Sequence, residues 1–324
     1  MLTVQKFGGS SVADAGKIKR VAGIIAERAR DGGSVVVVLS ARGDTTDELI
    51  SDAASISSEP PKRELDVLLS TGELSSVALM AMQLAKMGLN CVSLSGRQAG
   101  IMTDVNHGEA KITNINTDRI SRELGAGRIV LVAGFQGVSE NDDITTLGRG
   151  GSDTTAVALA AALHADRCEI YSDVDGIYTA DPRLVTGARK MDAIDYEDML
   201  RLSLGGSQVL HSRSVAAAMK YGVEVWLLSS YVSAPGTRLA RLDGRPDICG
   251  ITRDKALSRI SIVGKGVGRR TLAEAVAALS QHDILTLSAD TGDGVCELTV
   301  EPQHVMPAME ILHKQFFLSL SHSK

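Results

Sequence analysis

Several features that mark other protein classes are scarce in this sequence of 324 residues. Aromatic residues make up 3% of it, and there are 7 prolines and 4 cysteines. The cysteines are dispersed, with no CxxC pair and no cysteine–histidine spacing typical of a zinc site. We therefore expect reduced structural thiols in a cytosolic protein, rather than a disulfide framework or a zinc module.

Charge and hydrophobicity exclude further classes. The formal net charge is −5, so no broad positive field favours nucleic acid or an anionic membrane. The N-terminus lacks the basic start and apolar block of a signal peptide, and no apolar run reaches membrane-spanning length. These observations predict a cytoplasmic protein that binds neither nucleic acid nor a membrane.

What the sequence does contain is typical of an α/β protein. It has 32 glycines and 44% hydrophobic residues, and its length allows two domains. Val35–Leu39 is apolar without alternation, as expected for a parallel strand covered on both faces. Helical patterns separate such runs, which predicts helices on both sides of a mainly parallel sheet. The candidate strands are Leu2–Phe7, Val35–Ser40, Leu89–Ser95, Ile129–Ala133, Cys168–Ser172 and Val223–Leu228.

Three helices are predicted between these strands. Ile18, Val21, Ile24 and Ile25 recur at the spacing of one helical face. The other two helices cover residues 77–87, rich in alanine, methionine and leucine, and residues 155–163, rich in alanine.

The pattern changes near residue 245, which predicts a first domain at 1–245 and a second at 250–324. The order of elements in the second domain is βαββα, with a possible final strand, as in a small ferredoxin-like module. We interpret it as a regulatory or dimerising module, with a purely structural domain as the alternative. The expected elements are Ser258–Val263, Arg270–His282, Ile284–Ala289, Val295–Glu301, His304–Phe316 and the final strand Phe317–Ser321.

The first candidate site follows the first strand, in Lys6-Phe-Gly-Gly-Ser-Ser-Val12. The strand is expected to direct the Lys6 side chain towards the end of the sheet. Gly8 and Gly9 would let backbone N–H groups approach an anion there. Ser10 or Ser11 is expected to cap the next helix, whose N-terminus also favours an anion. A phosphate site is therefore favoured, although an ordinary strand–helix turn is the alternative and no Walker A motif occurs.

A second glycine-rich segment is Thr146-Leu-Gly-Arg-Gly-Gly-Ser-Asp-Thr-Thr155. Its glycines free the backbone to surround an anion, and Arg149 can bind a carboxylate through two hydrogen bonds. Ser152 or Asp153 is expected to cap the following helix. A well-capped buried helix is the alternative, but it does not explain an arginine among three glycines.

A third segment, Tyr171 to Arg183, ends a strand and is rich in Asp, Tyr and Arg. It could hold a nucleotide, with an aromatic ring beside the base and an arginine at the phosphates. Polar surface turns explain the aspartates equally well, and the spacing of a Ca²⁺ loop is absent.

Together these segments resemble the aspartate kinases of the amino acid kinase family, from residue 1 to about residue 240. The tail after residue 250 resembles one ACT unit, of which that family generally carries two. The resemblance rests on the three segments above and on Ser70-Thr-Gly-Glu73, Gly134-Phe-Gln-Gly137 and Val209-Leu-His211.

The resemblance implies a three-layer αβα amino acid kinase (carbamate kinase-like) fold with a ferredoxin-like ACT domain. It also implies transfer of the ATP γ-phosphoryl group, with Mg²⁺, to the β-carboxylate of L-aspartate, giving 4-phospho-L-aspartate. That carboxylate is ionised at neutral pH, so the enzyme needs no general base and supplies positioning and charge neutralisation.

The family pattern also implies a role for individual residues. Lys6 would neutralise the transferring phosphoryl group, with Gly8, Gly9 and Ser40 lining its path. Asp153 would orient Lys6 or meet the metal. The amino acid would be held by Arg149 at the α-carboxylate, by Glu73 at the α-ammonium, and by Thr46 and Ser152. The nucleotide side would be formed by Phe135, Ser172, Asp173, Tyr178 and Arg183.

Some positions depart from the family pattern. Gln208 stands where a lysine before Val-Leu-His is usual, which predicts a higher KM for ATP. Ser212, Trp226 and Arg42 also replace the usual residues. With a single ACT unit, we expect weak or absent feedback inhibition and a module kept for dimerisation, in a homodimer or higher homo-oligomer. Two alternatives remain open: a kinase for another acidic amino acid or aspartate analogue, and a non-catalytic regulatory partner.

Overall fold

The computed structural model describes residues 1–318, which divide into two compact units. The first unit contains Met1–Asp175 and Lys220–Pro235, and the second contains Gly176–Met219 and the chain from Gly236 onward. This division differs from the expected boundary near residue 245, because Gly176–Met219 groups with the C-terminal residues. The domain limits 1–245 and 250–324 stay a prediction.

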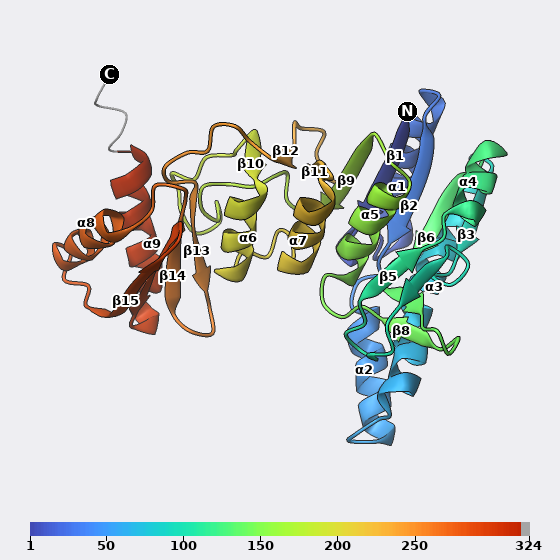
Figure 1. Cartoon of the computed structure of the whole chain (residues 1–324), viewed down its shortest axis with the longest axis horizontal. Coiled ribbons are helices and arrows are strands. Elements are labelled where there is room, and N and C mark those ends of the chain that lie inside the picture. Colours follow the sequence, from blue (N-terminus) through green and yellow to red (C-terminus); the bar gives the residue numbers. More distant parts are fainter. Residues whose placement is uncertain (319–324) are drawn as a thin grey trace. The chain divides into compact units, whose positions relative to one another are not determined.

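A parallel sheet forms the centre of the first unit (Figure 1), and its strands run in the order β11-β9-β1-β2-β6-β3. Neighbouring strands pair in parallel throughout this run. All six predicted strands are present, with ends that differ from the prediction by at most two residues. Their bounds are β1 Leu2–Phe7, β2 Ser34–Leu39, β3 Cys91–Leu94, β6 Ile129–Ala133, β9 Arg167–Ser172 and β11 Val225–Ser229.

Two long helices cover one face of this sheet. In α1 (Ala15–Arg30) the buried residues include Ile18, Val21 and Ile25, as their spacing predicted. The second helix, α3 (Lys62–Lys86), starts 15 residues before the expected 77–87 segment. Residues of both helices share one core cluster with alternate residues of β2 and β6. These contacts make the covered face of the sheet a continuous apolar layer.

The helix α1 does not begin as expected. Its N-cap is Asp14, whose Oδ1 accepts a hydrogen bond from the backbone N–H of Lys17 at 2.9 Å. Gly9–Ser11 forms a short 3₁₀ turn instead, and the Ser11 hydroxyl lies 2.8 Å from that of Ser230. The predicted serine cap is therefore wrong, because a tertiary hydrogen bond uses the hydroxyl.

Three more helices complete the first unit. The helix α5 (Gly151–Ala162) contacts β1, β2 and β9, and α4 (Asp118–Gly125) contacts β6. The helix α2 (Thr45–Ile56) packs beside α3 and has no fully buried residue. Helices thus accompany a mainly parallel sheet, as the predicted αβα fold requires.

A second, smaller sheet of the first unit has the order β5-β4-β7-β8. Its strands have only three or four residues each, and the sequence analysis did not predict them. The strand β8 ends at Thr146 and leads directly into the glycine-rich loop before α5. The strands of this smaller sheet are β4 Ile101–Thr103, β5 Ile112–Ile115, β7 Gln136–Val138 and β8 Ile144–Thr146.

The second unit contains a parallel strand pair and an antiparallel sheet. The pair is β10 (Ala193–Asp195) with β12 (Thr237–Ala240), and the sheet has the order β13-β14-β16-β15. The helices α8 and α9 contact this sheet, as predicted for a ferredoxin-like module. The remaining bounds are α6 Tyr196–Leu204, α7 Ser212–Tyr221, β13 Gly250–Asp254, β14 Arg259–Val263, α8 Arg269–Ser280, β15 Thr286–Gly292, β16 Val295–Val300 and α9 Val305–His313.

Two features of the C-terminal sheet differ from the prediction. The fourth strand is β13, which comes before the first expected strand, Ser258–Val263, and pairs antiparallel with β14. The expected final strand at Phe317–Ser321 is wrong at Phe317 and Leu318, which continue α9 as one π-helical turn, and its other residues lie outside the described range.

The core beneath that sheet also contains two residues from far earlier in the chain. Ala180 and Val185 are buried in the same cluster as Leu298 and Leu312. The segment that holds Ala180 and Val185 is tied to α9, because Thr179 Oγ1 lies 2.8 Å from Nε2 of the buried His313.

Among the described residues, α3 is the one helix long and apolar enough to cross a membrane by length and composition. Its buried residues include the polar Asp66 and Glu73, and it packs against α1, α2, β3 and β8. These contacts are those of a core helix.

Candidate active site

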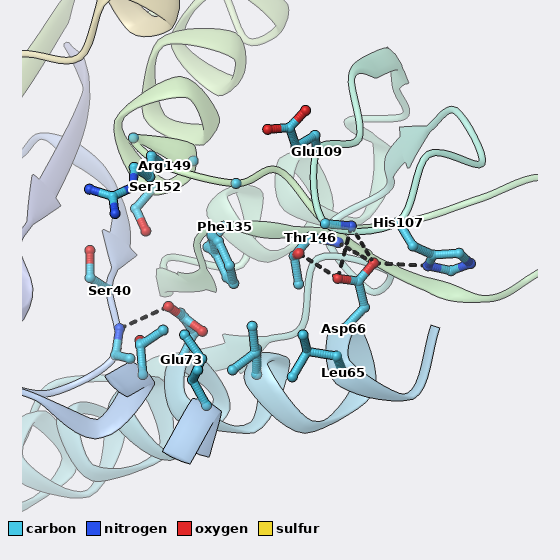
Figure 2. Close-up of a pocket in the computed structure, with 18 of the residues that line it drawn as sticks. Ser40, Leu65, Asp66, Glu73, His107, Glu109, Phe135, Thr146, Arg149 and Ser152 are labelled. Atoms are coloured by element: carbon cyan, nitrogen blue, oxygen red, sulfur yellow. Dashed lines mark hydrogen bonds and ion pairs between the residues drawn. The ribbon is translucent and has the colours of Figure 1, made fainter. Parts of the chain in front are cut away.

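A cleft of about 1340 Å³ opens in the first unit, at the carboxyl ends of β1 and β2. Figure 2 shows its walls, formed by the loop after β2, the first half of α3, the loop between β4 and β5, and the glycine-rich loop before α5. Ligand sites of open parallel sheets lie at this edge. The cleft is lined by these predicted site residues: Lys6, Gly9, Ser40, Thr46, Glu73, Phe135, Arg149, Ser152 and Asp153.

Two largely buried charges that line the cleft form an ion pair. Lys6 Nζ, near the end of β1, lies 2.7 Å from Asp153 Oδ1 in the first turn of α5, and the two side chains are only 12% and 14% exposed. A lysine held in this way can neutralise an anion that enters the cleft, with the carboxylate fixing where its ammonium points.

The two glycines after β1 differ in what surrounds them. A Cβ on Gly9 would lie 2.6 Å from the carbonyl oxygen of Ala41, whereas a Cβ on Gly8 would meet nothing closer than Lys6 Nζ at 3.5 Å. Gly9 is therefore required for the close approach of two backbone segments. Gly8 follows the same strand but is not among the lining residues.

The glycine-rich loop carries Arg149 between two residues with left-handed backbone. Gly148 and Gly150 have φ of 73° and 69°, a region that favours glycine. The N-cap of α5 is Gly150, so Ser152 and Asp153 lie inside the first turn and the predicted serine or aspartate cap is wrong. The Arg149 side chain is exposed at the cleft, where it can meet a carboxylate.

Glu73 is buried in α3 and faces the loop after β2. Its Oε1 accepts a hydrogen bond from the Ala41 backbone N–H at 3.0 Å, and its Oε2 has no hydrogen-bond partner among the described residues. Burial raises the pKa of the Glu73 carboxyl to about 7. A Cβ on the neighbouring Gly72 would lie 2.8 Å from that of Ala41, so this glycine allows the helix to approach. The free oxygen is placed to accept from a cation in the cleft.

Phe135 stands out for its backbone. Its φ of 67° is rare for an aromatic residue, and the conformation is fixed because its carbonyl accepts from Leu147 N–H at 2.8 Å. Its ring faces the cleft (Figure 2). Strained backbone of this kind is common where a ligand is bound.

The remaining predicted nucleotide residues lie away from this lining. Ser172 ends β9, and its hydroxyl lies 3.2 Å from Asp173 Oδ1. Tyr178 and Arg183 belong to the second unit, where Arg183 pairs with Asp181 at 2.8 Å. The first unit therefore brings the phosphoryl and amino-acid residues together without Ser172 or Asp173 in the cleft wall.

Two residues of the cleft, Asp66 and His107, were not among the predicted site residues. Asp66 lies in the first half of α3, a part of the helix that was not predicted, and it lines the cleft with His107. No local motif indicates Asp66, because its partners lie 41 and 80 residues away along the chain.

Comparisons with known proteins agree with this fold. The sequence profile of the amino acid kinase family matches residues 1–229. An aspartokinase of Mycolicibacterium smegmatis is 47% identical over 289 residues, covering 87% of this chain and 69% of its own. An aspartokinase of Geobacillus stearothermophilus is 49% identical over 286 residues, covering 87% and 70%.

Solved structures give the same result. The aspartate kinase of Synechocystis has a TM-score of 0.68 and 37% identity over 96% of this chain, which spans only 54% of that protein's chain. E. coli aspartokinase III in complex with aspartate and ADP has a TM-score of 0.70 and 26% identity over 93% of this chain and 78% of its own. The chain therefore belongs to the amino acid kinase family and, within it, to the aspartokinases.

Proposed function

We propose that this chain phosphorylates the β-carboxylate of L-aspartate with the γ-phosphoryl group of ATP. The observation that carries the proposal is one cleft lined by Lys6 and Asp153, by Arg149, and by Glu73 with an unpaired oxygen. The aspartokinase relatives support it, and E. coli aspartokinase III binds aspartate and ADP.

The amino-acid end of the substrate would be held by two opposite charges. Arg149 would bind the α-carboxylate, and Glu73 Oε2 would accept from the α-ammonium. The hydroxyls of Ser40, Thr46 and Ser152 line the same space and would complete the contacts. Hydrogen bonds to charged groups contribute about 1.5–3 kcal/mol each. Loss of Arg149 or Glu73 is therefore expected to weaken amino-acid binding.

At the phosphoryl end, Lys6 would neutralise the charge on the transferring group, and Asp153 would hold the ammonium of Lys6 in place. The backbone of Gly8 and Gly9 would line its path. The attacking carboxylate is already ionised, so these residues bind and orient and need not remove a proton. This division of roles explains why a lysine and glycines, rather than a histidine, occupy the end of β1.

Mg²⁺ would be held in the cleft mainly by the phosphates of the bound nucleotide. No group of three His, Cys, Asp or Glu side chains able to hold a metal ion occurs within residues 1–318. Asp153, the carboxylate that the family pattern implies could meet the metal, is already paired with Lys6. When bound with ATP, Mg²⁺ would supply charge neutralisation at the phosphates.

The nucleotide residues, assembly and location remain proposals from the sequence. Phe135, Ser172, Asp173, Tyr178 and Arg183 would form the nucleotide side. Gln208 would raise the KM for ATP. We also propose a homodimer or higher homo-oligomer in the cytoplasm, with weak feedback control.

A hydroxamate assay tests the activity. Purified protein is incubated with MgATP and L-aspartate, and hydroxylamine traps an acyl phosphate. Aspartyl hydroxamate from the wild type but not from Lys6→Ala supports the proposal. Product with another acidic amino acid but not with aspartate would replace the substrate, and no product from any acid with a folded protein would contradict the activity.

A further inference from the structure

A buried carboxylate in the wall of the cleft ties three segments together, and the reaction described above gives it no role. Asp66 of α3 is only 1% exposed. Its Oδ2 lies 2.8 Å from His107 Nδ1 and accepts from the backbone N–H groups of Gly108 and Thr146, both at 3.1 Å. Its Oδ1 accepts from the Thr146 hydroxyl at 2.5 Å. Figure 2 shows Asp66 between His107 and Thr146.

The partners of Asp66 come from two separate segments of the cleft wall. His107 and Gly108 belong to the loop between β4 and β5, and Thr146 is the last residue of β8. These segments also bond to each other, because the Thr146 carbonyl accepts from Ala110 N–H at 2.9 Å. Thr146 is thus held at its N–H, its hydroxyl and its carbonyl, and Asp66 accounts for two of these three bonds.

Thr146 is the anchor of the loop that carries Arg149. Only Leu147 and Gly148 separate the two residues, and glycines on both sides of Arg149 restrict this backbone less than other residues would, so its course depends on contacts such as that of Leu147 N–H with the Phe135 carbonyl. Arg149 itself is exposed and has no ion-pair partner among the described residues. The position of its guanidinium therefore depends on where the loop begins.

The same helix also carries Glu73, seven residues after Asp66. Two helical turns separate residues at this spacing, and they lie on one face. Glu73 contacts the loop after β2 through Ala41, whereas Asp66 contacts the start of the Arg149 loop. The helix α3 thus sets the spacing between the groups proposed to bind the α-ammonium and the α-carboxylate.

We propose that Asp66 is a positioning residue for amino-acid binding, which holds the Arg149 loop at a fixed distance from Glu73. This inference rests on the proposed function. Misplacing a binding group by about 1 Å can cost about a hundredfold in rate. We expect loss of Asp66 to raise the KM for aspartate at least about tenfold, with a much smaller effect on the KM for ATP.

The test compares Asp66→Asn with Glu123→Gln in the full chain. Glu123 is also a helical carboxylate that is nearly buried, paired with Arg119 and Arg128 at 2.6 Å each, but it is not in the cleft. Steady-state kinetics give kcat and both KM values for each variant, and amide hydrogen exchange follows the peptides 105–110 and 146–151. We expect a raised KM for aspartate and faster exchange in both peptides for Asp66→Asn, and neither change for Glu123→Gln.

A second pair of variants keeps the test valid if Asp66→Asn does not fold. Thr146→Val removes the hydroxyl that donates to Asp66 but keeps the shape, whereas Thr146→Ser keeps that donor. The KM for aspartate should be higher for Val than for Ser. Equal values for the two, or a folded Asp66→Asn protein whose KM for aspartate stays within about twofold of the wild type, would overturn the proposal.

Failure of the proposed function gives a different result. A wild-type protein without aspartate kinase activity contradicts the reaction, and hydrogen exchange then decides the role of Asp66. Faster exchange at 146–151 in Asp66→Asn, but not in Glu123→Gln, supports positioning of the loop. Unchanged exchange overturns it.

Discussion

The ammonium of Lys6 and the carboxylate of Asp153 lie 2.7 Å apart, and they come from a strand and a helix that are distant in the sequence. The strand β1 and the helix α5 pack against each other, so the pair is held by the core of the first unit. A lysine positioned before the substrate arrives needs little reorganisation in the transition state.

The first prediction concerns this pair. Lys6→Ala should lower kcat by about 10²–10³-fold, the usual loss when a group that stabilises transition-state charge is removed. Lys17→Ala is the control. The Lys17 side chain is 33% exposed, and its ammonium lies 4.0 Å from the Asp14 carboxylate, which is the upper limit for an ion pair. The measurement is the initial rate of ADP release at saturating substrates. A Lys6→Ala enzyme with at least a tenth of wild-type kcat would contradict the role.

The second prediction concerns pH. Burial raises the pKa of Glu73 to about 7, so the ionised form that can bind an ammonium grows as pH rises through that value. The KM for aspartate should therefore fall between pH 6 and pH 8, by up to about tenfold per pH unit below the pKa. Glu73→Gln should have a higher KM that no longer changes in this range. A wild-type KM that is flat across it would refute the assignment.

The third prediction separates the two glycines of the first loop. A Cβ at residue 9 would lie 2.6 Å from the Ala41 carbonyl oxygen, so backbone must shift, whereas at residue 8 its nearest neighbour is 3.5 Å away. Gly9→Ala should destabilise the protein by about 1–3 kcal/mol, the usual cost of overpacking, and lower kcat/KM. Gly8→Ala should keep the wild-type Tm. Thermal unfolding and kinetics of both variants provide the check, and equal Tm values for the two would contradict the prediction.

The fourth prediction concerns the second unit. Burial lowers the pKa of His313 below its usual 6.5, with Glu310 opposing the shift and Arg189 reinforcing it. The unfolded chain therefore gains a proton on this histidine before the folded chain does. The contribution of His313 to the free energy of unfolding is therefore complete above pH 6.5. It falls as the pH decreases towards the pKa that His313 has in the folded protein.

Hydrogen exchange of α9, corrected for intrinsic rates, should therefore show faster opening at pH 5.5 than at pH 7.5. His313→Gln should reduce that difference. A difference that is the same in both proteins would show that other groups cause it.

Much of the site could be predicted from sequence because its residues follow buried strands. Lys6 near the end of β1 and Arg149 among glycines each occur next to a local pattern that indicates an anion site, whereas Ser40 after β2 was expected from the family resemblance alone. Parallel strands bring such ends to one edge of a sheet, which agrees with the single site that the family resemblance implied for these distant motifs.

The rest depended on contacts between distant parts of the chain. Ser11 bonds to a residue 219 positions later, and this contact outweighed its local capping preference. Asp66 lies in a helix buried on several sides, which has no clear apolar stripe to reveal its start. The strands of the smaller sheet are too short for an alternating pattern to be visible.

The burial of Ala180 and Val185 beneath the C-terminal sheet bears on how this chain can be divided experimentally. These residues follow Tyr178 closely, yet their apolar neighbours include Leu298 and Leu312. A protein cut near residue 245 would expose them to water and release the backbone between Tyr178 and Arg183. Measurements on residues 1–245 alone would therefore report on a chain whose segment around Ala180 and Val185 lacks its apolar neighbours.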